Sequence, residues 1–113
     1  MSEQNPIIKT VLKNAASKKR DDIESEWFFY LRENLKFPFQ AEVNLISYSS
    51  AVSDGDIVKV IGLDNMIDMY GVIMKVKKGR KTLYMPLEEL ELLDKKTKNY
   101  KIINAFLDWY SNY

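Results

Sequence analysis

The 113-residue chain contains neither cysteine nor histidine. Without cysteine, the chain cannot form disulfides, use a thiolate nucleophile or bind zinc through thiolates. Without histidine, it lacks the commonest general base near neutral pH and the commonest nitrogen ligand of transition metals. Any metal site must therefore be built from oxygen ligands, which favours a hard cation such as calcium or magnesium.

Glycine is also scarce, with only four residues in the chain. None of them forms a glycine-rich loop of the kind that cradles phosphates. A Ser-His-Asp or Cys-His catalytic set is impossible without histidine and cysteine. The sequence therefore predicts a protein that is not an enzyme.

Neither sign of charge dominates: seventeen basic residues and sixteen acidic residues give a formal net charge of +1. A dedicated duplex-binding protein usually carries a clear basic excess, so nucleic acid is disfavoured as a partner. No segment approaches the 18 consecutive apolar residues of a membrane span, and the N-terminus has no apolar run of signal-peptide length. We expect a cytoplasmic protein with no membrane partner.

The composition is that of a folded globular protein, with 46% hydrophobic and 29% charged residues. At this length the chain can bury one hydrophobic core, so we predict a single domain over residues 1–113. Within it we expect a helical N-terminal part over 1–36, a barrel over 37–94 and a C-terminal helix over 95–113.

Three stretches have the apolar spacing of helices: 6–18, 21–36 and 100–110. Asn5 is the expected N-cap of the first helix, because Pro6 suits the first helical position. The second stretch carries four aromatic residues in a row over 27–30. They either pack in the core against a sheet and the last helix, or present an aromatic surface to a partner.

Shorter segments have the alternation or apolar content of strands: 39–45, 57–61, 69–76 and 82–87. A loop is expected over 62–68, and a tight hairpin turn over 77–80 with Gly79 at positive φ. Leucines among acidic residues over 87–94 predict a turn that closes the mouth of a barrel. The predicted fold class is α+β, a small SH3-like β-barrel flanked by N-terminal helices and a C-terminal helix.

Carboxylates in the predicted loops could hold a cation through oxygen ligands. Asp64 and Asp68 share one loop with Asn65, and these two carboxylates are the first candidates. The second candidates are the remaining loop carboxylates: Asp54, Asp56, Glu88 and Glu89. The spacing does not match an EF-hand loop, so ordinary surface carboxylates are the alternative interpretation.

The predicted hairpin is basic and provides the competing hypothesis, a binding module for a protein or nucleic-acid partner. The candidate contacts are Lys77, Lys78 and Arg80 on the hairpin and Trp27 and Phe28 on the aromatic helix. Lysines at a hairpin also commonly protect an exposed sheet edge, so this pattern does not by itself predict a partner.

Four motifs, in the same order along the chain, resemble the CcbP-type calcium-binding protein family. Residues 27–41, from the aromatic run into Phe37-Pro38-Phe39, resemble that family's W-Y-Y-Y-L-x-x-x-L-x-F-P-F-x-A segment. The run 55–62 looks like its G-D-x-V-x-V-x-G motif. Gly79-Arg80 followed by 85–87 is similar to its hairpin return, and 108–110 to its D-W-x-Y/W ending.

This resemblance implies a soluble, bacterial-type protein that binds calcium through acidic side chains, as a buffer or sensor. The implied cofactor is therefore Ca²⁺, and the implied partner is the calcium ion itself. We expect the affinity to be weak, because the predicted loops supply few carboxylates.

Overall fold

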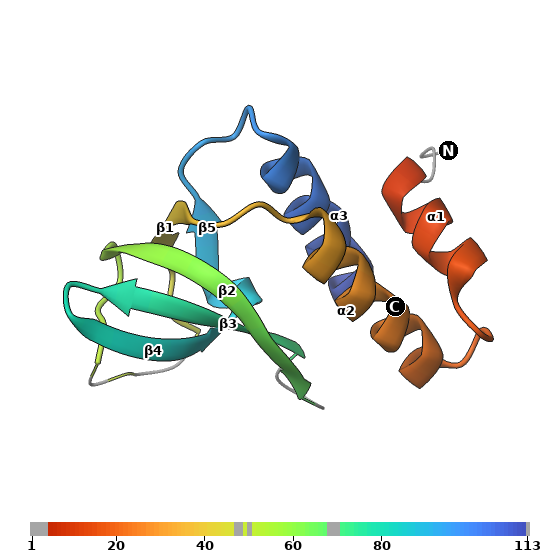
Figure 1. Ribbon diagram of the computed structural model, residues 1–113, viewed down its shortest axis with the longest axis horizontal. Helices are drawn as coiled ribbons and strands as arrows, with labels where there is room; N and C mark the ends of the chain where they lie inside the picture. The colour runs from red at the N-terminus through yellow and green to blue at the C-terminus, as the bar shows by residue number, and fades with distance from the viewer. Residues whose placement is uncertain (1–4, 47–48, 50, 68–70, 113) are drawn as a thin grey trace. The chain divides into compact units, whose positions relative to one another are not determined.

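The computed structural model describes residues 5–46, 49, 51–67 and 71–112 (Figure 1). The chain divides into two compact units, which are described separately. The helical unit comprises Met1–Leu35 and Thr97–Tyr113, and the sheet unit comprises Lys36–Lys96. These borders lie close to the predicted limits of the barrel, whereas the single domain stays a prediction.

The helical unit contains three α-helices that contact one another: α1 (Pro6–Asn14), α2 (Arg20–Asn34) and α3 (Lys98–Asn112). Asn5 caps α1 as predicted, since its side-chain oxygen accepts a hydrogen bond of 2.8 Å from the Ile7 N–H. The prediction that this helix continues to residue 18 is wrong, because the backbone becomes extended at Ala15. In the described part of the chain, no helix is long and apolar enough to cross a membrane.

Aromatic rings form the centre of the helical unit. Trp27 is fully buried, and its ring lies 5.4 Å from that of Phe106 and 6.0 Å from that of Trp109. Aliphatic side chains from all three helices are also buried: Ile8, Val11, Ile23, Leu31, Ile102 and Ile103. The aromatic run of α2 therefore contributes its tryptophan to a core shared with the last helix, as one of the two predicted roles requires, while packing against a sheet stays a prediction.

The sheet unit contains one antiparallel sheet of five strands. They are β1 (Phe39–Val43), β2 (Ile57–Ile67), β3 (Gly71–Lys78), β4 (Lys81–Pro86) and β5 (Leu90–Leu92), and a short 3₁₀ helix, η1 (Leu87–Glu89), precedes β5. The strand order is β4-β3-β2-β1-β5, so β4 and β5 are edge strands. The α+β class is confirmed, but among the described strands the sheet is not closed into the predicted SH3-like barrel.

Strand β2 is longer than the sequence predicts. It continues to Ile67, so the loop expected over 62–68 is absent across the described residues 62–67. The register against β3 shifts at Ile61 and again at Asp64, which makes each of them the extra residue of a β-bulge. Gly62 and Asn65, which follow the two bulge residues, pair with Lys75 and Ile73 of β3.

The exposed and buried sides of the sheet are clearest in β5 and at the ends of β3 and β4 toward the hairpin, whereas the first four residues of β3 are all buried. Val58 of β2 lies opposite the buried Ala41 of β1, and Val60 lies opposite the buried Val76 of β3. The buried face is aliphatic, with Val72, Met74, Met85, Leu90 and Leu92 as further members. The predicted hairpin turn is confirmed, because Lys78 pairs with Lys81 and Gly79 between them has φ +61°.

Candidate cation site

The turn 54–56, which carries two of the predicted ligands, is held against the end of β1. The Gly55 N–H donates to the Val43 carbonyl, and the Val43 N–H donates to the Asp56 carbonyl, each over 2.8 Å. Gly55 has φ +86°, a left-handed conformation that favours glycine. The turn thereby places the Asp54 carboxylate beside the segment that follows β1.

Two predicted ligands meet in this segment, at consecutive backbone amides. Asp54 Oδ1 accepts a hydrogen bond of 2.6 Å from the Leu45 N–H. Glu89 Oε2 accepts one of 3.2 Å from the Ile46 N–H, and the Glu89 carbonyl accepts one of 2.8 Å from the Asn44 N–H. Because Leu45 and Ile46 are neighbours, the two carboxylates lie beside the same dipeptide although they are far apart in sequence.

Each of these carboxylates keeps one oxygen outside the contacts with the backbone. In the described part of the chain no other hydrogen bond or ion pair reaches Asp54 Oδ2 or Glu89 Oε1. Both side chains are also at least partly accessible to solvent. Each side chain therefore has one oxygen that a cation could take while the backbone holds the other oxygen.

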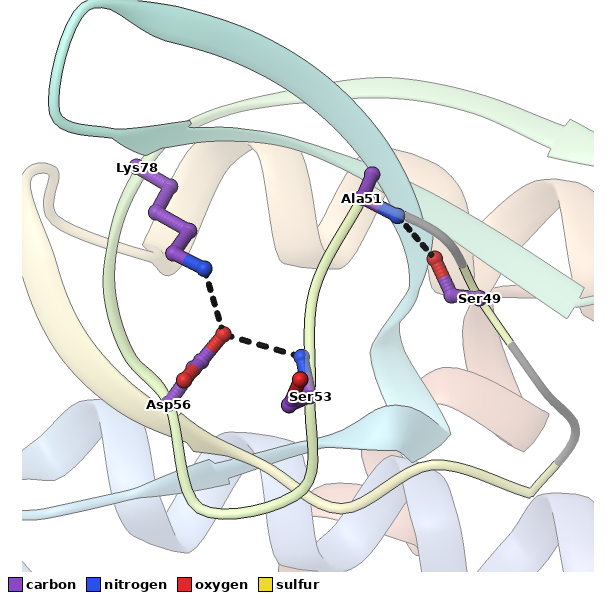
Figure 2. A network of polar contacts seen from close by, with 5 residues as sticks. All are labelled: Ser49, Ala51, Ser53, Asp56 and Lys78. Atoms are coloured by element: carbon purple, nitrogen blue, oxygen red, sulfur yellow. Dashed lines mark hydrogen bonds and ion pairs between the residues drawn. The ribbon is translucent and has the colours of Figure 1, made fainter.

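Asp56 is engaged differently, as Figure 2 shows. Its Oδ2 accepts hydrogen bonds from the Lys78 ammonium at 2.7 Å and from the Ser53 N–H at 2.9 Å. The Lys78 hydrogen bond and the Ser53 N–H lower the pKa of the Asp56 carboxyl below its ordinary value of 3.8. Asp56 and Lys78 therefore form an ion pair with each other. The sequence instead suggested Asp56 as a cation ligand and Lys78 as a contact for a partner.

The remaining predicted ligands lie apart from such contacts or outside the described residues. Asp64 is exposed in the second bulge of β2, and Glu88 is exposed in η1. Asp68 lies outside the described residues. Among the residues described, no three acidic side chains are grouped closely enough to hold a metal ion.

Asp54 and Glu89 provide the oxygen ligands that calcium prefers, but they are fewer than a calcium site needs. Calcium takes six to eight oxygen ligands, among them carboxylates, backbone carbonyls and water. Asp54 and Glu89 supply two suitable carboxylate oxygens. The other ligands of a site here would be backbone carbonyls of the adjoining loop and water molecules.

The residues predicted to contact a partner differ in their exposure to solvent. Trp27 is fully buried, so the prediction that it contacts a partner is wrong: its ring is needed in the core of the helical unit. Phe28 is half-buried. Lys77 and Arg80 are exposed on the hairpin and remain candidates.

The comparison with protein families identifies the chain. A family model described as calcium binding, that of the CcbP proteins, matches residues 6–110. The chain belongs to the CcbP family of calcium-binding proteins. The resemblance drawn from the sequence motifs is thus confirmed, and the family supports Ca²⁺ as the cofactor. No curated protein sequence matches the chain.

Two solved structures share the CcbP fold with this chain. The crystal structure of Anabaena CcbP is 16% identical, with a TM-score of 0.77 over 98% of this chain and 94% of that one. A calcium-binding protein in its calcium-binding form is 17% identical, with a TM-score of 0.72 over 98% of this chain and 96% of that one. At these identities the comparison establishes the fold, and the ligands have to be argued from this chain's own residues.

Sequence reasoning named Asp54 and Glu89 only as second candidates. It ranked Asp64 and Asp68 first because it placed them in a loop, whereas Asp64 lies in a strand. The sequence did not indicate that the backbone N–H groups of Leu45 and Ile46 bind these carboxylates, because every residue except proline has such a group. The pairing of these amides with carboxylates depends on the fold alone.

Proposed function

We propose that this protein is a non-catalytic, cytoplasmic calcium-binding protein, acting as a buffer or sensor, and that Asp54 and Glu89 are its principal carboxylate ligands. The observation that carries this assignment is the placement of both carboxylates on the consecutive amides of Leu45 and Ile46. Family membership supports the ion, and this placement supports the position.

The arrangement favours a divalent cation for electrostatic reasons. Asp54 and Glu89 both place negative charge beside this dipeptide, and a cation bound to their outer oxygens would gain from both charges. The backbone N–H groups orient the carboxylates, as hydrogen bonds to ligand oxygens do in many metal sites. With only two carboxylates the affinity should be weak, with a dissociation constant of about 10⁻⁴–10⁻³ M.

Asp56 supports this site indirectly. Its ion pair with Lys78 holds the end of the turn that carries Asp54. Because one carboxylate oxygen already binds an ammonium group, Asp56 is a poorer ligand than its neighbour. Asp64, Asp68 and Glu88 remain alternative ligands, and the experiment below separates them from the proposed pair.

The test is calorimetric titration of the metal-free protein with calcium, and with magnesium as the comparison ion. We expect saturable heat with calcium and none with magnesium. Asp54→Asn and Glu89→Gln should each weaken calcium binding about tenfold or more, because each removes a charged ligand. Glu33→Gln, an exposed change of the same charge on α2, is the matched control and should leave the affinity unchanged.

Two results would contradict different parts of the proposal. Wild-type protein that gives no heat with calcium would exclude the function itself. Normal calcium affinity in both Asp54→Asn and Glu89→Gln, with loss of affinity in Asp64→Asn or Glu88→Gln, would move the site to the alternative carboxylates.

A further inference from the structure

The exposed face of β2, β3 and β4 gathers cations that the calcium site does not use. Lys59 on β2 lies directly opposite Lys77 on β3, and Lys75 is two residues before Lys77 on the same face. On β4, Tyr84 lies opposite Lys75 and Thr82 lies opposite Lys77. All five side chains are exposed, and together they are called the lysine face.

This placement of the lysines costs stability. Residues directly opposite in an antiparallel pair have Cα atoms about 4.5–5.5 Å apart, and like charges there repel. No described residue forms an ion pair with Lys59, Lys75 or Lys77. Lys78, the next residue along β3, is by contrast neutralised by Asp56. The lysine face is therefore an uncompensated patch of positive charge.

Tyr84 adds an aromatic ring to this patch. Its side chain is 56% exposed, among the most exposed large hydrophobic groups in the described part of the chain. No other described ring stacks on it. The ring and the ammonium group of Lys75, on directly opposite residues, can therefore be reached by one ligand.

We propose that the lysine face binds single-stranded nucleic acid, with Lys59, Lys75 and Lys77 contacting phosphates and Tyr84 stacking on a base. Charge complementarity favours a polyanion, because the lysines lack carboxylate partners. Single-strand binding without sequence preference combines these two elements, a row of cations and an exposed aromatic ring.

Two features favour this ligand over an acidic protein. A protein interface takes most of its binding energy from anchor side chains that become buried in pockets. The lysine face offers a polar row across three strands instead, formed by Lys59, Lys77 and Thr82. An exposed ring can stack on a base, and a cation beside it can contact the phosphate of the same nucleotide. The net charge of +1 concealed this face, because acidic residues elsewhere in the chain balance its lysines.

The test measures fluorescence anisotropy of a labelled oligothymidylate of about ten nucleotides, a length within single-strand site sizes, with the full-length protein. We expect saturable binding at low salt that weakens as salt is added. The Lys59→Gln/Lys77→Gln double variant should bind more weakly, and the slope of log K against log salt should fall by about 1.4, or 0.7 for each lost phosphate contact. Lys9→Gln/Lys13→Gln, the same charge change on exposed residues of α1, should behave as wild type.

Tyr84 provides an independent readout. Tyr84→Ser should weaken binding about fivefold or more, and Tyr84→Phe should retain it, because stacking needs the ring and not the hydroxyl. Misfolding is not an explanation for the lysine variant: removing two opposed like charges should leave the melting temperature unchanged or raise it.

Several outcomes would overturn the proposal. They are the absence of saturable binding at low salt, equal loss in the α1 control variant, and indifference of affinity to Tyr84→Ser. Displacement of the oligonucleotide by polyglutamate at equal charge concentration would also reject nucleic acid and assign the face to acidic proteins. Because no calcium is added, these results are independent of the calcium titration.

Discussion

The helical unit and the sheet unit use different kinds of interaction. Both tryptophans of the chain belong to the helical unit, where Trp27 and Trp109 pack with Phe106 in a buried aromatic cluster. The buried face of the sheet is aliphatic, with valines and methionines such as Val60 and Met74. The helical unit thus concentrates its packing in a few large rings, while the sheet spreads it over many smaller side chains.

The polar contacts of the two units join residues at different separations along the sequence. In the helical unit, Arg20 pairs with Glu24 one turn along the same helix. In the sheet unit, Glu89 binds the Ile46 amide 43 positions away, and Lys78 binds Asp56 22 positions away. Contacts of the first kind support a helix, and those of the second kind bring distant carboxylates and amides together. This difference explains why both candidate binding surfaces lie on the sheet unit.

The largest expected effect is loss of the central ring of the helical unit. Trp27→Ala should lower the free energy of unfolding by about 3–5 kcal/mol, since it removes a fully buried side chain that touches several others. Urea denaturation monitored by circular dichroism measures this change. Phe29→Ala, on the same helix but half exposed, should cost far less.

A second variant at this position tests the reason for the loss. The Trp27 indole N–H is buried and has no hydrogen-bond partner among the described residues. Trp27→Phe keeps an aromatic ring and removes this donor, so it should cost less than Trp27→Ala. Equal losses in the two variants would show that ring packing is not what the site requires.

An intermediate effect is expected at the turn beside the candidate calcium ligands. Gly55→Ala should cost about 1–2 kcal/mol of unfolding free energy, because the left-handed φ of +86° strains any residue with a Cβ atom. No atom of the described residues lies within 4 Å of the added methyl, so the expected cost comes from backbone strain. Gly62→Ala has equal space without a positive φ and should not destabilise the protein, as the same denaturation experiment will report.

The smallest effect concerns the Asp56 ion pair and its dependence on pH. The folded-state pKa of Asp56 is lowered, so its stabilising contribution is present above pH 3.8 and is lost as pH falls through the folded-state value. Asp56→Asn should therefore be less stable than wild type near neutral pH, and the two should converge in acid. Unfolding curves at about pH 7 and about pH 3 make the comparison, and a stability difference that persists unchanged in acid would contradict it.

The sequence predicted those parts of the fold that depend on local interactions. Asn5 and Pro6 mark the start of α1, and the side chain of Asn5 makes the expected cap. Gly79 marks the hairpin turn, where its positive φ is required. In each case the signal lies within a few residues of the structure that it specifies, which is why single-sequence reasoning could find it.

Features that depend on pairing across the sheet were missed. Gly62 and Asn65 are turn formers by residue type, and only the register against β3 shows that they are paired strand residues beside two bulges. The meeting of Asp54 and Glu89 likewise depends on where η1 lies relative to the end of β1, which brings their carboxylates to the amides of Leu45 and Ile46. No spacing rule within one segment encodes such a contact.

The two edges of the sheet, as the described strands define them, have a consequence for contacts between copies of this chain. An edge strand with free backbone groups can pair with another copy and begin aggregation. Strand β5 is only three residues long, and β4 starts at Lys81 and ends at Pro86, which has no N–H to donate. The short strand at one edge, and the charge and proline at the other, discourage edge-to-edge pairing. We therefore expect the chain to resist aggregation through these edges at high protein concentration.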